Sequence, residues 1–178
     1  SALFEIIDNS IQAEAKNIHI IVAEKKVLSP SGKKIKLISD VIIYDDGKGI
    51  SRQIMDYCLV LGGSNRLGAK EGLGKFGHGL PEASCSQADR TEVYSWQKSS
   101  KAYLSYFDFD ELRPQEDPKL PDTKQVEVPK ELKFPIERII KKGGFNHFNN
   151  DSGTIIHWQM ADRHDHKTIA AFFRNFEF

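Results

Sequence analysis

The sequence predicts an α+β fold, a two-layer sandwich in which helices pack on a sheet. Several segments repeat apolar residues every three or four positions, which is typical of amphipathic helices. Other segments are apolar runs beside turns rich in glycine, proline or serine, a pattern typical of hairpin-paired strands. Because hairpins and helices are interspersed, the pattern favours this class over a doubly wound parallel sheet, in which helices join the strands.

The elements of the first third follow from local patterns. A helix is expected over 1–16, where apolar side chains at three- and four-residue spacings form one face. Strands are expected over 17–26 and from residue 36 to an abrupt stop at Asp45, on either side of a turn. Ser51 is then expected to cap a helix over 52–61.

The rest of the chain continues this alternation after a glycine-rich segment. A short helix is expected over 81–88, with Pro81 in its first turn. Five of the seven prolines fall in the charged stretch 113–135, which we expect to be a partly extended surface excursion. The other expected elements are strands over 90–97, 101–111 and 153–162 and helices over 134–142 and 166–176.

Length and composition bound the class of protein. The 178 residues fit one domain, 1–178, and 39% hydrophobic with 28% charged residues describe a globular chain. No signal peptide or membrane-spanning run is visible in the sequence, so an intracellular location is expected. Cys58 and Cys85 are expected to be buried, reduced thiols. Both ends look cut, and we expect a piece of a longer protein.

Charge is evenly balanced overall but clustered near the first turn. The formal net charge of zero gives no general attraction to nucleic acid or acidic membranes. A basic cluster can contact DNA phosphates or form a solvated hairpin tip, and the zero net charge favours the solvated tip. The clustered residues are Lys25, Lys26, Lys33, Lys34 and Lys36.

The first polar motif lies on the expected first helix. Glu5 and Asn9 are four residues apart, so their side chains share one helical face. A carboxylate there can polarise a water as general base, and an amide oxygen can bind a hard cation such as Mg²⁺. This pair alone favours a solvated polar face, although Asp8 and Gln12 extend the same polar stripe.

The second motif, DDGKG at 45–49, ends an apolar strand. A carboxylate at this place can accept a hydrogen bond from the exocyclic amine of a base, and the glycines allow a ligand ring to lie against the backbone. An Asp-Gly hairpin turn is the alternative. A hairpin needs an apolar strand next, whereas a helix cap follows here, which weakens that alternative.

The third motif is GLGKFGHGL at 72–80. Backbone N–H groups of glycine-rich turns can point at phosphate oxygens, and the N-terminus of a following helix adds positive potential. A loose turn is the alternative. The motif is no Walker loop, and its G-x-G-x-x-G letters lack the preceding strand of a dinucleotide fingerprint.

Taken in order, FEIIDNSIQA, DDGKGI, GLGKFGHGL and the later Gly153-Thr154 resemble the motifs of the GHKL ATPases. That superfamily includes gyrase B, the ninety-kilodalton heat-shock chaperones, sensor histidine kinases and MutL. The resemblance covers most of the chain, from Leu3 to Trp158. It implies the Bergerat fold, in which a mixed, mostly antiparallel sheet lies under helices and ATP binds between the layers.

The resemblance also implies roles for individual residues. Glu5 is implied to be the catalytic base and Asn9 the Mg²⁺ ligand. Asp45 is implied to bind adenine, supported by Thr154 through a water. The other residues implied to surround ATP are Gly47, Gly49 and Ile50 near adenine and Gly74, Lys75, Phe76, Gly77, His78, Gly79 and Leu80 at a phosphate-binding lid.

Within the superfamily, FEIIDNSIQA followed by FGHGLPEAS most resembles the microrchidia (MORC) ATPases. This implies an ATP-gated homodimer that acts on DNA or a partner protein through domains outside this sequence, with the lid closing over the nucleotide. The proline-rich insert and the missing domain that supplies a lysine to the γ-phosphate depart from that pattern. A GHKL protein kinase and a nucleotide-sensing module without hydrolysis stay open as alternatives. Glu5, one turn before Asn9, favours an ATPase that is slow in isolation.

Overall fold

The computed structural model describes residues 2–60, 79–98, 101–144, 148–159, 168, 169 and 172. The α+β class and an antiparallel sheet are confirmed. In chain order, the elements are α1 (Ala2–Gln12), β1 (Ile18–Leu28), β2 (Lys34–Asp45), α2 (Arg52–Met55), α3 (Gly79–Gln87), β3 (Arg90–Trp96), β4 (Ala102–Asp108), α4 (Phe109–Leu112), β5 (Lys124–Val126), α5 (Lys130–Lys142) and β6 (Gly153–Gln159).

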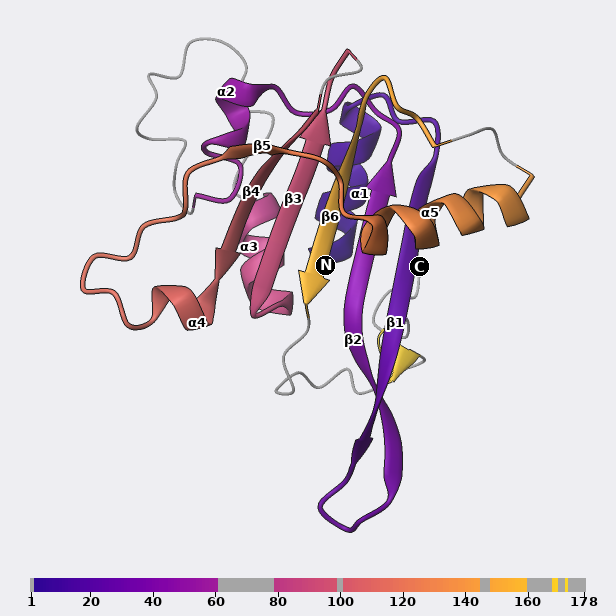
Figure 1. Ribbon diagram of the computed structural model, residues 1–178, viewed down its shortest axis with the longest axis vertical. Coiled ribbons are helices and arrows are strands. Elements are labelled where there is room, and N and C mark those ends of the chain that lie inside the picture. Colours follow the sequence, from indigo (N-terminus) through magenta and orange to yellow (C-terminus); the bar gives the residue numbers. More distant parts are fainter. Residues whose placement is uncertain are drawn as a thin grey trace.

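Six strands form one sheet in the order β1-β2-β6-β3-β4-β5 (Figure 1). The last strand in sequence, β6, inserts between β2 and β3 and pairs with both in antiparallel register. Thr154 on β6 is therefore the register partner of Asp45 on one side and of Ser95 on the other. The sheet thus gathers polar residues from three distant parts of the chain into one row.

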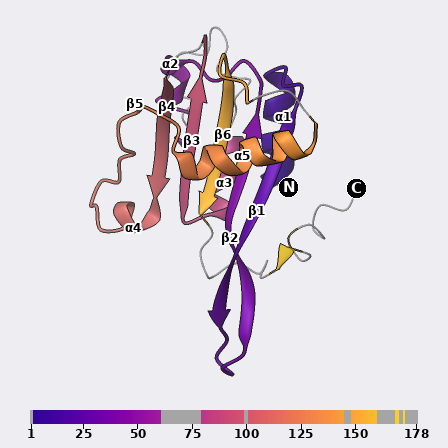
Figure 2. The same cartoon turned by 45° about the vertical axis from the view of Figure 1, so that its right-hand side comes forward.

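Helices cover both faces of this sheet. Because side chains alternate along a strand, Ile43 packs toward α1 and α3, while its neighbour Tyr44 packs toward α5. Figures 1 and 2 show α5 crossing one face, with α1 and α3 behind the other. A helix was expected over 134–142, but a helical layer on this second face was not; α5 covers a second core, which the sheet separates from the polar row beside α1.

The hairpin of β1 and β2 extends past the body of the domain (Figures 1 and 2). Strand β6 pairs with β2 only over Asp40–Asp45, so the outer part of the hairpin is a two-stranded ribbon. A shift in register between Ala23 and Glu24 marks the place where the ribbon leaves the sheet. We call residues 24–38 the arm.

Two expected helices differ from the structure. Helix α2 has only four residues, and the side chain of Ser51 makes no capping hydrogen bond; its carbonyl accepts from the N–H groups of Ile54 and Met55 instead. Helix α5 begins at Lys130 and contains Pro135, within the stretch expected to be an excursion. Apolar side chains at four-residue spacing explain this start, because they bury one face of α5: Leu132, Ile136 and Ile140.

Smaller expectations have mixed outcomes. Cys58 is buried as expected, whereas Cys85 is only half-buried, and both thiols are free. Of the expected last helix, Phe172 is fully buried and its N–H donates to the Thr168 carbonyl over 2.9 Å, while most of 166–176 lies outside the described residues. Within the described ranges, no helix has the length and apolar character that crossing a membrane requires.

Candidate functional site

Helix α1 meets the end of β2 through a buried hydroxyl. The Ser10 hydroxyl is 3.0 Å from Asp45 Oδ2 and 3.1 Å from the Ile6 carbonyl. Both Ser10 and Asp45 are almost fully buried. The first two motifs, which lie on a helix and at a strand end, therefore share one site.

Asp45 is a buried carboxylate with spare hydrogen-bonding capacity. Its Oδ1 accepts a hydrogen bond from the Gly47 N–H over 2.9 Å, and its Oδ2 accepts one from Ser10. Burial raises the pKa of Asp45 to about 6, against the opposing effect of these two donors. No basic side chain among the described residues forms an ion pair with it. A carboxylate offers about four acceptor positions, so positions remain for a ligand's donor.

The neighbouring Asp46 has a structural role, as an acceptor of hydrogen bonds from the segment that follows α1. Its carboxylate accepts hydrogen bonds of 2.7 Å from the Lys16 N–H and of 2.8 Å from both the backbone and the side chain of Asn17. Burial acts to raise its pKa, but these hydrogen bonds outweigh burial and hold it below the ordinary value. Asp46 therefore holds the connection between α1 and β1, while Asp45 faces α1.

The glycines of this region allow close packing. A Cβ on Gly47 would lie 2.8 Å from Asp45 Oδ1, and a Cβ on Gly153 would lie 2.8 Å from the Asp45 carbonyl. Gly49 has φ of +72°, and a Cβ there would lie 2.1 Å from the Trp96 carbonyl. These positions need glycine to bring β2, β3 and β6 together, and their expected role beside adenine stays a prediction.

Thr154 belongs to a hydroxyl pair in the same polar row. Its Oγ1 is 2.9 Å from Ser95 Oγ, which also lies 3.0 Å from the Gly153 carbonyl and accepts from the Ile50 N–H over 2.7 Å. All of these atoms belong to buried side chains or backbone. Ser95 therefore fixes both the strand that carries Thr154 and the turn that follows Asp45.

Sequence reasoning missed Ser10 and Ser95. Each was visible as a polar residue at a position whose helical or alternating neighbours are apolar: Ser10 follows Ile6 by four residues, and Ser95 follows Val93 by two. A buried hydroxyl needs a partner, so that pattern could have indicated a polar site.

Glu5 is exposed on α1 and lies against the first residue of α3. A Cβ on Gly79 would be 2.5 Å from Glu5 Oε2, so a larger residue there would displace this carboxylate from its position. Asn9, one turn further along α1, is half-buried, and Leu80 is buried in the core. The remaining residues expected at the lid lie outside the described residues: Gly74, Lys75, Phe76, Gly77 and His78.

The chemistry of the site fits a Mg²⁺ ion held mainly by a ligand's phosphates. Within the described part of the chain, no three His, Cys, Asp or Glu side chains gather as a metal site. Mg²⁺ in phosphate sites is bound through one or two protein oxygens together with phosphate and water oxygens. The amide oxygen of Asn9 is a donor of the right kind.

A known family model matches most of the chain. The family model described as histidine kinase-, DNA gyrase B-, and HSP90-like ATPase matches residues 1–136. Thr154 and β6 lie outside the matched stretch. A search of the curated proteins gave no match.

Two solved structures resemble this chain at low sequence identity. The N-terminal domain of a DNA repair protein has 16% identity and a TM-score of 0.48, covering 89% of this chain and 34% of that one. The ATP-binding domain of topoisomerase IV from Francisella tularensis, in complex with a small-molecule inhibitor, has 14% identity and a TM-score of 0.43, covering 98% of this chain and 40% of that one. The chain therefore spans about a third to two fifths of the length of these two.

Proposed function

Because the chain belongs to the histidine kinase-, DNA gyrase B- and HSP90-like ATPases, we propose that it binds ATP beside α1 and hydrolyses it with Mg²⁺. The observation that carries this proposal is the 3.0 Å hydrogen bond between Ser10 and Asp45. It joins the helix that bears Glu5 and Asn9 to the strand end that bears Asp45. Asp45, the carboxylate proposed to recognise adenine, and Glu5, the proposed catalytic carboxylate, thereby lie on adjoining elements.

In this proposal Asp45 recognises adenine. Its buried carboxylate accepts a hydrogen bond from the exocyclic amine, and low local polarity makes that bond stronger than in water. Thr154 lies in the same row of the sheet, held by Ser95, and contacts the base through a water. Gly47, Gly49 and Ile50 form the adjoining turn.

The phosphates lie toward Glu5 and Gly79. The nine residues of α3 begin at Gly79, and the free N–H groups at a helix N-terminus favour an anion. Asn9 holds Mg²⁺, which supplies positive charge to the phosphates. Glu5 orients the attacking water and accepts its proton, in a reaction that depends mainly on positioning and charge stabilisation.

The resemblance extends the proposal beyond this site. It includes closure of residues 62–79 over bound nucleotide, ATP-dependent homodimerisation, and a MORC-like action on DNA or a partner protein. The residues proposed to contact the phosphates at this lid are Gly74, Lys75, Phe76, Gly77, His78, Gly79 and Leu80. The proposal also includes an intracellular location. Each of these parts has its own assay, and none is needed for the test of ATP binding.

Calorimetry with Mg²⁺ and a non-hydrolysable ATP analogue tests binding, and phosphate release tests turnover. We expect Asp45→Asn to weaken binding at least tenfold, because an amide cannot replace both acceptors of the carboxylate. Glu5→Gln is expected to bind normally and to lose turnover. Asp8→Asn, the same kind of change at an exposed position of α1, is the control and should do neither.

The outcomes separate the classes of function. Binding without turnover in the wild-type protein indicates a sensing module, and transfer of the γ-phosphate to a protein side chain indicates a kinase. If no adenine nucleotide binds to the wild-type protein, the proposal is wrong. Turnover that survives Glu5→Gln would instead remove only the base assignment.

A further inference from the structure

We propose that the arm binds B-form DNA and that Lys26, Lys34 and Lys36 contact its phosphates. This inference rests on the DNA-directed part of the proposed function and names the surface responsible. It concerns a segment that lies outside the candidate nucleotide site.

The arm concentrates the positive charge of the protein. Its residues 24–38 contain five lysines and one glutamate, a net charge of +4, while the whole chain has a net charge of zero. The remainder of the chain therefore carries −4. Such an uneven distribution directs a polyanion to the arm and away from the body of the domain.

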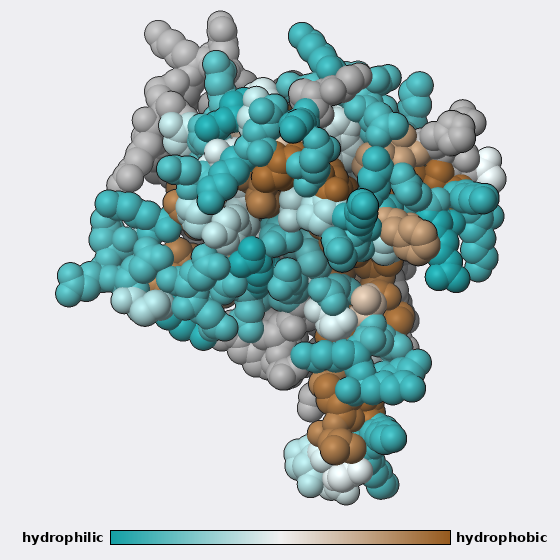
Figure 3. Space-filling model, viewed as in Figure 1, coloured by the Kyte–Doolittle hydropathy of each residue, from teal (hydrophilic) through white to brown (hydrophobic). Residues whose placement is uncertain are grey.

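The pairing of the strands places three of these lysines on one face. Lys26 is opposite Lys36, and Leu28 is opposite Lys34, two residues further along. Opposed residues share a face and so do residues two apart, so all four side chains point the same way. The other face carries the pairs Lys25–Leu37 and Val27–Ile35 and is mainly apolar. Figure 3 shows hydrophilic and hydrophobic surface along the projecting hairpin.

This arrangement is unfavourable for the isolated fold. Like charges directly opposite each other in a strand pair destabilise it, as Lys26 and Lys36 do here. Lys36 forms an ion pair with Glu24, with Nζ 3.3 Å from Oε2. Lys26 and Lys34 form no ion pair with any described residue. Glu24 therefore compensates one member of the like-charged pair only, and a local rule broken in this way is expected where a residue serves function.

The shape of the arm favours duplex DNA among polyanions. Two strands about 4.8 Å apart form a ribbon, and the major groove of B-DNA, about 12 Å wide, admits a two-stranded ribbon. The major groove of A-form RNA is too deep and narrow to be entered in this way. The exposed Leu28, on the lysine face, offers apolar contact of the kind made with thymine methyl groups.

Protection of a sheet edge is the competing explanation. Lysines on edge strands discourage the edge-to-edge association of sheets. In the arm, β1 and β2 pair only with each other among the described strands, so each has one edge without a strand partner. On that explanation, neutralising the lysines increases self-association and leaves DNA affinity unchanged.

Fluorescence anisotropy with a short labelled DNA duplex, over a series of salt concentrations, tests the proposal. The test variant is Lys26→Gln/Lys34→Gln/Lys36→Gln. The control is Lys130→Gln/Lys141→Gln/Lys142→Gln, which removes three exposed charges from α5. We expect the arm variant to reduce the slope of log affinity against log salt by about three, one for each phosphate contact, equally for two unrelated DNA sequences.

Four results would overturn the proposal. Two concern the variants: an arm variant that binds DNA as tightly as the wild-type protein, or an α5 control that loses as much affinity as the arm variant. Two concern the ligand: tighter binding of duplex RNA than of duplex DNA, or competition by polyglutamate as strong as that by unlabelled DNA. The last would identify an acidic protein surface as the partner. Binding of the ATP analogue is measured on the same proteins. Retained nucleotide binding shows that the arm variant is folded, and it separates failure of the arm from failure of the ATPase proposal.

Discussion

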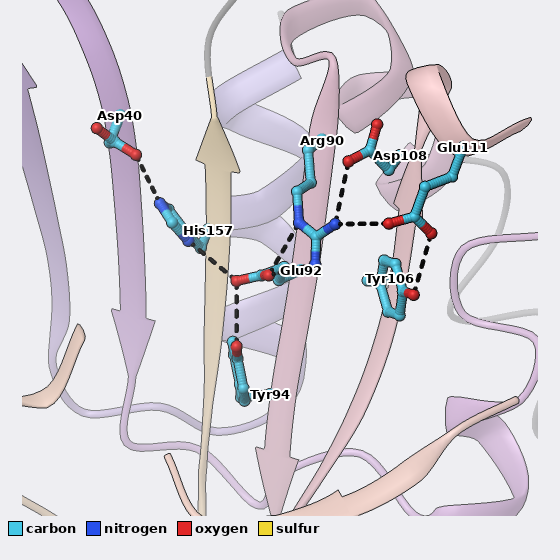
Figure 4. Close-up of polar contacts among 8 residues, drawn as sticks. All are labelled: Asp40, Arg90, Glu92, Tyr94, Tyr106, Asp108, Glu111 and His157. Atoms are coloured by element: carbon cyan, nitrogen blue, oxygen red, sulfur yellow. Dashed lines mark hydrogen bonds and ion pairs between the residues drawn. The ribbon is translucent and has the colours of Figure 1, made fainter. Parts of the chain in front are cut away.

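His157 and Glu92 share a hydrogen bond between neighbouring strands, with Nδ1 of the imidazole 3.2 Å from Oε2 of the carboxylate. The other ring nitrogen lies 2.8 Å from Asp40 Oδ1. Arg90 continues the chain of alternating charges from Glu92 to Asp108 and Glu111 (Figure 4). This network crosses the face of the sheet on which α5 packs, so it stabilises the sheet without taking part in the candidate nucleotide site.

The network predicts a loss of stability in alkaline solution. Burial alone would lower the pKa of His157, but the hydrogen bonds to Asp40 and Glu92 outweigh it and raise the pKa to about 9, from 6.5 in the unfolded chain. The contribution of the imidazolium to the free energy of unfolding is therefore complete below pH 6.5 and is lost as the pH rises to about 9. Its size is on the order of 3 kcal/mol.

Urea unfolding at several pH values checks this prediction. The free energy of unfolding of the wild-type protein should fall between pH 6.5 and 9, and that of His157→Gln should stay nearly flat over the same range. Parallel curves for the two proteins would show that His157 is not charged in the folded state.

The candidate site residues stand in local sequence motifs, whereas the architecture that joins them depends on distant pairing. Glu5, Asn9 and Asp45 stand in short motifs, so their chemistry is readable from neighbours a few residues away. The pairing of Asp45 with Thr154 is of another kind, because it depends on β6 entering the sheet between β2 and β3. Separation of more than a hundred residues leaves no local pattern for that insertion.

The prolines misled the prediction of where α5 begins, because its helix was expected over 134–142 only. Five prolines in 113–135 favour extended chain, yet α5 begins inside this stretch and contains Pro135. Burial of Leu132 and Ile136 against the second core outweighs the local cost of the proline. The four-residue spacing of the apolar residues was visible in the stretch, but the core against which they pack is formed by distant strands and was not.

Gly49 and Gly32 form a matched pair for a second prediction. Both have positive φ, +72° and +76°, but a Cβ on Gly49 would lie 2.1 Å from the Trp96 carbonyl, while one on Gly32 meets nothing within 4 Å. Gly32→Ala should cost about 1 kcal/mol, from backbone strain alone. Gly49→Ala should cost about 3 kcal/mol, because a backbone carbonyl must also move. Equal losses in thermal or urea unfolding would contradict the close approach.

A third prediction concerns the contact of Gly79 with Glu5. A methyl group at Gly79 would come within 2.5 Å of Glu5 Oε2 and must displace that carboxylate. Gly79→Ala should therefore reduce kcat of ATP hydrolysis at least tenfold with little change in affinity for the ATP analogue, since Glu5 acts on water. Glu82→Ala, at an exposed position of the same helix, is the control. A variant that loses affinity but keeps kcat would show that the added methyl group disturbs phosphate binding and not Glu5.

The last prediction compares two buried hydroxyls on β3. Ser95 accepts a hydrogen bond from the Ile50 N–H over 2.7 Å, whereas Thr91 Oγ1 has no hydrogen-bond partner in the described part of the chain. Ser95→Ala leaves a buried N–H without an acceptor and should lower the free energy of unfolding by about 2 kcal/mol. Thr91→Val removes a buried hydroxyl to which the described residues offer no hydrogen-bond partner, and it should raise the free energy of unfolding by about 1 kcal/mol. Urea unfolding of the two variants tests this prediction through the sign of the change in the free energy of unfolding. If the loss of a polar group alone mattered, that free energy would change in the same direction in both variants.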